Sequence, residues 1–290
     1  MKDVVVATLT TPDGERRLLV RPPTAPTGTS LRPAVMLLHG AGGTAELALA
    51  NTGWREAADR EGFVLALPEG TRRDPAAPPS FLRNPQAWND GSGRGHTARA
   101  GTDDVGFIGA ALDALVRRHG VDPARIYLSG FSNGAAMVFR AAAALPDRVA
   151  AIGPVAGHCW TTPAPLPRPV PALMLFGGRD LLNPPEGGDV KTPWGHAEYH
   201  PPVLQSFDRW RSASVCRGQP VVRTNEHGDQ DHAATGCAPG ADVRCLIIAD
   251  LGHHWPGAPR LLPSWIAGPA SRRIRGAEIL WEFFRRHRIA

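Results

Sequence analysis

Short apolar runs alternate with helix-forming stretches along most of this chain, and this alternation constrains the fold more than any other feature. Apolar runs of strand length occupy residues 34–39, 63–67, 125–129, 150–155, 172–176 and 243–249. Periodic stretches between and after them predict helices at 45–60, 103–119, 133–145, 203–214 and 272–287. Such alternation is typical of a mainly parallel sheet with helices on both faces, so the expected fold class is α/β.

The chain length and the loop pattern favour one domain. A chain of 290 residues is within the range of a single α/β domain with elaborated loops. The stretches 71–101 and 177–202 are rich in Pro and Gly and are predicted to be long loops. Thr102 is expected to cap the helix that begins at Asp103. Because the strand pattern continues beyond 177–202, we expect a single domain over residues 1–290.

The charge pattern argues against nucleic acid and membrane partners. The 32 Lys and Arg and the 27 Asp and Glu give a net charge of +5, dispersed along the chain with no run of five basic residues. No apolar stretch approaches the ~20 residues that span a bilayer. The first eight residues, from Met1 to Thr8, lack the apolar core of a signal peptide. The chain as written is therefore expected to be cytoplasmic, or secreted if its N-terminus has been trimmed.

The strongest local motif is Gly130-Phe131-Ser132-Asn133-Gly134, which matches G-x-S-x-G. A predicted strand precedes it and an Ala-rich helix follows it, which is the context of a nucleophile elbow. Glycines two residues either side of the serine suit a tight turn with closely passing neighbours. Ser132 is therefore the expected nucleophile, whereas the motif alone could also be an ordinary strand–turn–helix.

A serine hydroxyl needs a base, and the base needs an orienting carboxylate. Asp180 follows the predicted strand 172–176 closely and is the expected acid, with Asp189 as a more distant competitor. His253 follows the late strand 243–249 and is the expected base. The adjacent His254 would then contact substrate, lie at the rim or be exposed. The order Ser, Asp, His is that of α/β-hydrolases.

A glycine-rich segment follows the first buried strand, His39-Gly40-Ala41-Gly42-Gly43. Backbone N–H groups there can approach a developing oxyanion, and the expected donors are those of Ala41 and Asn133. The segment lacks the Gly-Lys-Ser/Thr ending of a phosphate loop and does not complete G-x-G-x-x-G. Phosphate binding is therefore unsupported.

Together these motifs resemble the esterase family that includes poly(3-hydroxybutyrate) depolymerases and bacterial feruloyl esterases. The resemblance extends from about Leu19 to Phe284. The matching segments are Leu38 to Gly43, Leu67 to Gly70, Ala87 to Asn89, Asp103 to Ile108, Gly130 to Gly134, and Gly252-His253-His254-Trp255-Pro256-Gly257. The last is the most specific, since the family typically has Gly-His-x-Trp-Pro-Gly there. The resemblance implies an α/β-hydrolase fold and a triad of Ser132, Asp180 and His253.

The cysteines depart in part from that family. The chain has four, Cys159, Cys216, Cys237 and Cys245, and none forms a CxxC pair. The stretch 90–96 lacks the cysteine pair that many relatives carry. The resemblance implies a disulfide between Cys216 and Cys237; free thiols, or a bond between Cys237 and Cys245, are the alternatives.

The expected activity is hydrolysis of a small-molecule or polymer ester through an acyl-enzyme, with no cofactor and no metal. Trp255, Trp160 and His254 are the candidate substrate contacts, although tryptophans can equally anchor loops to the core. Metal binding by His196 and His200, or by the polar turn 227–232, is not expected. Another serine hydrolase activity, as peptidase or perhydrolase, and a catalytically silent binding protein are the alternatives. The ester and the oligomeric state are left open.

Overall fold

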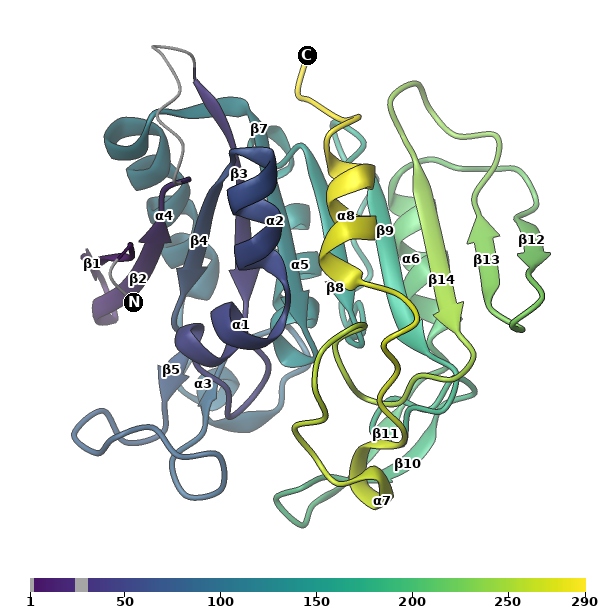
Figure 1. The fold of residues 1–290 in the computed structure, drawn as a ribbon, viewed down its shortest axis with the longest axis horizontal. Coiled ribbons are helices and arrows are strands. Elements are labelled where there is room, and N and C mark those ends of the chain that lie inside the picture. Colours follow the sequence, from purple (N-terminus) through teal and green to yellow (C-terminus); the bar gives the residue numbers. More distant parts are fainter. Residues whose placement is uncertain (1–2, 24–30) are drawn as a thin grey trace.

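Six parallel strands form the centre of a ten-stranded sheet in the computed structural model, which describes residues 3–23 and 31–290. The strand order is β1-β2-β4-β3-β7-β8-β9-β14-β13-β12 (Figure 1). Strands β4 to β14 of this series pair in parallel, whereas β1, β2, β13 and β12 pair antiparallel at the two flanks. Met1 and Lys2, part of the segment inspected for a signal peptide, lie outside the described residues.

The main sheet and two small ribbons account for the strands of the described residues. Their bounds are β1 Val5–Thr11, β2 Gly14–Arg21, β3 Arg32–Leu38, β4 Val64–Pro68, β5 Thr71–Arg72, β6 Gln86–Ala87, β7 Val121–Phe131, β8 Ala151–Val155, β9 Ala172–Gly177, β10 Gly188–Lys191, β11 Ala197–His200, β12 Val221–Thr224, β13 Gln230–Ala233 and β14 Val243–Ile248. The helices are α1 Ala45–Asn51, α2 Trp54–Glu61, α3 Gly95–Arg99, α4 Asp104–His119, α5 Asn133–Ala144, the short 3₁₀ turn Pro146–Arg148, α6 Leu204–Ala213, α7 Ser264–Ala267 and α8 Gly276–Phe284.

Helices cover both faces of the sheet. Figure 1 shows α1, α2 and α8 in front of it and α4, α5 and α6 behind it. The central strands are buried on both faces, so successive apolar side chains enter opposite cores. In β3, for example, Met36 and Leu38 join the core under α4 and α5, whereas Val35 and Leu37 join the core under α2 and α8. The structure is thus the expected α/β-hydrolase class with a mainly parallel central sheet.

Several element boundaries differ from the sequence expectation. The helix expected at 45–60 is two helices, because Gly53 takes a left-handed φ of 78° between them. Asp103, and not Thr102, caps α4, with its carboxylate accepting the Gly106 N–H at 2.8 Å. The expected long loops also contain short elements: β5, β6 and α3 lie within 71–101, and the β10–β11 hairpin lies within 177–202.

Cys216 and Cys237 form a disulfide, as the family resemblance implied. It joins the end of α6 to the segment between β13 and β14, 21 residues later in the chain. Cys159 and Cys245 are free and buried. Burial raises the pKa of the Cys159 thiol to about 12, so this thiol stays protonated near neutral pH.

Among residues 3–23 and 31–290, the structure contains no helix that is both long and apolar enough to cross a bilayer.

Candidate active site

Ser132 occupies a strained turn between β7 and α5. Its φ of 55° and ψ of −120° place a non-glycine residue in a region that L side chains rarely adopt. The glycines on either side of Ser132 make the turn possible, because the backbone passes so close to them that a side chain at either position would overlap it. A Cβ at Gly134 would overlap the carbonyl oxygens of Leu38 and His39, and a Cβ at Gly130 would lie 2.5 Å from the Gly134 oxygen. The turn therefore holds the serine at the carboxyl edge of the sheet.

Three side chains that are distant in sequence form a hydrogen-bonded chain at this edge. His253 Nε2 lies 2.9 Å from Ser132 Oγ, and His253 Nδ1 lies 2.8 Å from Asp180 Oδ2. Asp180 and His253 are 2% and 5% exposed, so water scarcely competes for these bonds. The carboxylate can only accept, so Nδ1 carries the proton and Nε2 accepts from the serine hydroxyl. This is the tautomer in which the imidazole can act as a base toward Ser132.

The loop after β9 fixes the carboxylate. Asp180 Oδ1 accepts from the backbone N–H groups of Leu182 and Asn183, at 2.8 and 2.7 Å. The other oxygen is thereby directed to His253. Asp189, the competing acid, is exposed on β10 and does not take this position.

His254 is turned away from Ser132. Its Nε2 lies 3.2 Å from the Gly268 carbonyl oxygen, and its side chain is buried rather than exposed. Burial lowers the pKa of His254, so its imidazole is neutral near pH 7 and donates to that carbonyl. His254 thus supports the loop that carries His253, although it also lines the cavity described below.

The Ala41 and Asn133 N–H groups lie on two segments beside Ser132, the loop after β3 and the first turn of α5. Within the described residues neither N–H donates to another protein group. Neighbouring donors are engaged: Gly42 N–H bonds Gln86 O at 2.7 Å and Gly43 N–H bonds Gly40 O at 2.9 Å. These two donors are therefore free to meet an oxygen of a bound ligand.

His39 and Trp88 brace the oxyanion loop, a feature that the sequence did not reveal. His39 Nε2 accepts the Gly70 N–H at 3.0 Å, and Trp88 Nε1 donates to the His39 carbonyl at 2.8 Å. The Asn133 side chain in turn holds the Trp88 backbone, accepting its N–H at 2.8 Å and donating to its carbonyl at 3.0 Å. The relevant signal was the Ala87-Trp88-Asn89 segment, but its partners are distant in sequence.

A cavity of about 1160 Å³ opens at Ser132 and His253. Both tryptophans expected as substrate contacts line it, in different ways. Trp255 is only 5% exposed and packs in the core with α8, so most of its ring anchors the loop. Trp160 is half-buried, and the Arg94 guanidinium lies 4.0 Å from the centroid of its ring. Trp160 therefore offers more ring surface to the cavity than Trp255 does.

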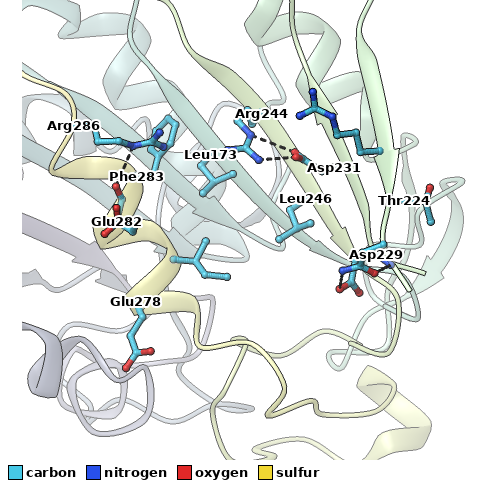
Figure 2. A pocket seen from close by; sticks show the side chains of 13 residues that line it. Leu173, Thr224, Asp229, Asp231, Arg244, Leu246, Glu278, Glu282, Phe283 and Arg286 are labelled. Carbon is cyan, nitrogen blue, oxygen red and sulfur yellow. Dashed lines mark hydrogen bonds and ion pairs between the residues drawn. The ribbon is translucent and has the colours of Figure 1, made fainter. Parts of the chain in front are cut away.

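A second hollow, of about 690 Å³, lies away from the catalytic side chains between α8 and strands β12 to β14 (Figure 2). Its floor is apolar, with Leu173, Leu246 and Phe283. Its rim is charged, and Asp231 is paired there with Arg244 at 2.6 Å. The polar turn considered as a metal site contributes Asp229 and Asp231 to this rim, where arginines neutralise both. In the described part of the chain, no group of three or more His, Cys, Asp or Glu side chains is arranged to hold a metal ion.

Comparison with known proteins identifies the family. The family model described as "Esterase PHB depolymerase" matches residues 18–163. The protein named "Putative esterase NocK" from Nocardia uniformis subsp. tsuyamanensis is 30% identical over 278 residues, covering 90% of this chain and 76% of that protein. "Feruloyl esterase B" of Piromyces equi is 27% identical over 248 residues, covering 82% of this chain and 42% of that protein.

Two further similarities concern a larger enzyme and the fold. The bifunctional acetylxylan esterase/xylanase XynS20E of Neocallimastix patriciarum is 28% identical over 257 residues, and this chain spans only 33% of its length. The solved acetyl xylan esterase from Aspergillus awamori superposes with a TM-score of 0.59 at 14% identity, covering 86% of this chain and 94% of that one. This last likeness supports the fold alone.

The strained serine, its hydrogen-bonded histidine and aspartate, and the matches in sequence agree with one another. The chain therefore belongs to the Esterase PHB depolymerase family and is a serine carboxylic ester hydrolase with the α/β-hydrolase fold.

Proposed function

We propose that Ser132, His253 and Asp180 are the catalytic triad of this esterase and that catalysis passes through an acyl-enzyme. The observation that carries the proposal is the continuous pair of hydrogen bonds from Ser132 through His253 to Asp180, at 2.9 and 2.8 Å. Nucleophile, base and orienting acid are thus within bonding reach before substrate arrives.

In the first step, Ser132 Oγ attacks the ester carbonyl carbon and its proton passes to His253 Nε2. The imidazolium that forms is stabilised by the Asp180 carboxylate, which stays ionised. The tetrahedral intermediate collapses, the bond to the alcohol oxygen breaks, and His253 returns the proton to that oxygen. The alcohol leaves and the acyl group remains on Ser132.

In the second step, water attacks the acyl carbon while His253 takes one of its protons. The second tetrahedral intermediate expels Ser132 Oγ, which recovers the proton from His253. The carboxylic acid is released and the enzyme is restored. Both tetrahedral intermediates carry their negative oxygen toward the N–H groups of Ala41 and Asn133. Loss of one such donor typically lowers the rate about 10²–10³-fold.

The substrate is proposed to be an ester with a flat or ring-shaped part beside the reacting bond. The supporting observation is the aromatic lining of the cavity, in which Trp160 and Phe131 belong to the segments that follow β8 and end β7. Feruloyl esters fit this description, whereas hydroxybutyrate oligomers lack a ring. A comparison of kcat/KM for methyl ferulate, hydroxybutyrate oligomers and p-nitrophenyl acetate ranks these classes.

The choice of base is tested by two neighbouring substitutions. His253→Ala is expected to lower kcat for p-nitrophenyl butyrate by about 10³-fold or more, because Ser132 then lacks a proton acceptor. His254→Gln, which keeps a side-chain donor, is expected to retain activity within about tenfold of the wild type. Circular dichroism of both proteins shows whether they are folded. An active His253→Ala enzyme beside an inactive, folded His254→Gln enzyme would reverse the assignment.

A further inference from the structure

His158 enters the active-site cavity through a strained turn at the end of β8. Ala156, the next residue after the strand, has a φ of 51° and is held by a bond from its N–H to the Leu175 oxygen at 2.8 Å. Gly157 follows and packs on the backbone of Ser132, where a Cβ would overlap the Ser132 oxygen. Strained, non-glycine conformations cluster at functional sites. This turn sets His158 beside the nucleophile, in the wall of the same cavity.

The His158 imidazole is buried, and the side chain of Asn183 is a polar group beside it. The His158 side chain is 1% exposed, and in the described residues neither ring nitrogen has a well-oriented hydrogen bond. Most buried polar groups in native proteins are paired, and leaving one unpaired is destabilising. Burial, with smaller contributions from His200 and Arg94, outweighs the opposing effect of the Asn183 side chain and lowers the pKa of His158 to about 3. Near pH 7 the ring is therefore neutral and has one N–H donor and one acceptor nitrogen.

The other polar groups of this wall are already engaged. His200 Nδ1 lies 2.6 Å from Asn183 Oδ1, and its Nε2 lies 2.9 Å from Arg94 Nη1. Because a guanidinium only donates, Nε2 must accept and Nδ1 must carry the proton that Asn183 receives. The Arg94 charge is met by Glu198 at 2.5 Å. His200 and Arg94 are thus fixed, and the wall carries little net charge.

Aromatic rings surround His158 in the wall of the cavity. Its ring centroid lies 5.1 Å from that of Trp160 and 5.4 Å from that of His200. Trp160 and His200 meet edge to face, with their ring centroids 5.5 Å apart. The Arg94 guanidinium stacks on the Trp160 ring, 4.0 Å from its centroid. Such aromatic surfaces suit a ring or a short apolar chain of a substrate, and His158 adds a polar side chain to this wall.

We propose that His158 is a specificity-determining residue that exchanges hydrogen bonds with an uncharged hydroxyl group on the non-reacting part of the ester. A hydroxyl can donate to the unprotonated nitrogen of a neutral imidazole or accept from the protonated one, so it can pair with whichever nitrogen faces the substrate. A carboxylate or an ammonium group gains little from this wall, because the charges of Arg94 and Glu198 are already paired with each other. This inference rests on the proposed function, because it assigns a role within the same esterase site.

The test compares matched esters that differ by one hydroxyl group. On the acyl side, methyl 3-(4-hydroxyphenyl)propanoate is paired with methyl 3-phenylpropanoate. On the alcohol side, 2-hydroxyethyl butyrate is paired with propyl butyrate. The measured quantity is the ratio of kcat/KM for the hydroxylated ester to kcat/KM for the plain one. Wild-type enzyme is expected to favour the hydroxylated member of at least one pair, and that pair identifies the side that His158 contacts.

His158→Phe removes both nitrogens and keeps a ring. For the ester pair in which the wild type favours the hydroxylated member, His158→Phe is expected to lower the ratio of the two kcat/KM values about tenfold. This is the effect of losing one hydrogen bond to the substrate hydroxyl. The variant's melting temperature is expected to be close to that of the wild type, because no well-oriented protein hydrogen bond is lost and a buried ring is kept. His158→Gln, which has a donor and an acceptor, should keep most of the ratio. His232→Phe, a change of the same kind on β13 outside the cavity, should leave the ratio unchanged.

The outcomes separate this inference from the proposed function. Hydrolysis of plain esters with equal ratios in wild type and His158→Phe overturns the role of His158 and leaves the triad intact. A lower melting temperature with unchanged ratios also overturns it, because His158 would then be structural. No hydrolysis of either ester by folded wild-type protein overturns the proposed function, and the inference with it.

Discussion

At the scale of single residues, Asp229 holds the loop that leads to His253. Asp229 lies in the turn between β12 and β13 and is buried. Its two oxygens bond the two terminal nitrogens of Arg273, each at 2.6 Å, and Oδ1 also accepts the Ala249 N–H at 2.9 Å. Arg273 reaches Asp250 as well, at 2.8 Å. One carboxylate thus joins three segments around the exit of β14.

This carboxylate predicts a pH-dependent contribution to stability. The hydrogen bonds from Arg273, more than any other group, lower the pKa of Asp229 far below its ordinary value of 3.8. A depressed folded-state pKa stabilises the protein at pH values above the unfolded-state pKa, and this stabilisation disappears as the pH falls through the folded value. Asp229→Asn is therefore expected to lower the unfolding free energy by about 2 kcal/mol at pH 7.

Thermal unfolding from pH 7 to pH 3 measures this contribution. The difference in melting temperature between wild type and Asp229→Asn should be largest near neutral pH and should shrink below about pH 4. Asp208→Asn, in the exposed pair with Arg211, is the control and should change little at any pH. A difference that grows toward acid pH would contradict the predicted role of Asp229.

At the scale of elements, the strand–turn–helix around Ser132 depends on close backbone contact. Gly134, in the first turn of α5, lies against the carbonyls at the end of β3. By contrast, a Cβ at Gly109 in α4 would have its nearest neighbour 3.7 Å away, at a flexible Arg148 side chain. The same substitution should therefore have opposite effects in the two helices.

Gly134→Ala is expected to destabilise the protein by more than about 2 kcal/mol and to reduce esterase activity, because α5 or β3 must move. Gly109→Ala should be neutral or stabilise by up to about 1 kcal/mol, because alanine favours helix. Urea unfolding of both variants measures the two free energies. Equal, small effects would show that the elbow tolerates a side chain at position 134.

The elements that could be predicted from the sequence are those whose burial requires a recognisable run of apolar residues. The central parallel strands are apolar on both faces, and their runs at 34–39 and 172–176 correspond to β3 and β9. The short strands β10, β11 and β12 carry no such signal. All four residues of β12, Val221–Thr224, are exposed, and β10–β11 joins by a turn within a Pro- and Gly-rich stretch. β12 pairs with β13 and β10 with β11 across short turns, and these hairpins form without the buried apolar run that marks a central strand.

At the scale of the whole molecule, the fold brings together residues that the chain keeps far apart. Ser132 and His253 are 121 positions apart, and His253 and Asp180 are 73 apart. Their order and their places after strands could be predicted, because parallel strands end at one edge of the sheet. The turn at Ala156, the orientation of His158 and the brace of His39 by Trp88 could not, because each depends on contacts between separate loops.

The central claim is that Ser132 is a nucleophile activated by His253. Labelling the folded protein with a fluorophosphonate probe and mapping the adduct by peptide mass spectrometry tests this most directly, since such probes react with activated serines. We predict one adduct, on Ser132, in the wild type, none in Ser132→Ala, and a rate of labelling about 10³-fold lower in His253→Ala. An adduct on another residue, or folded wild-type protein that does not react, would contradict the claim.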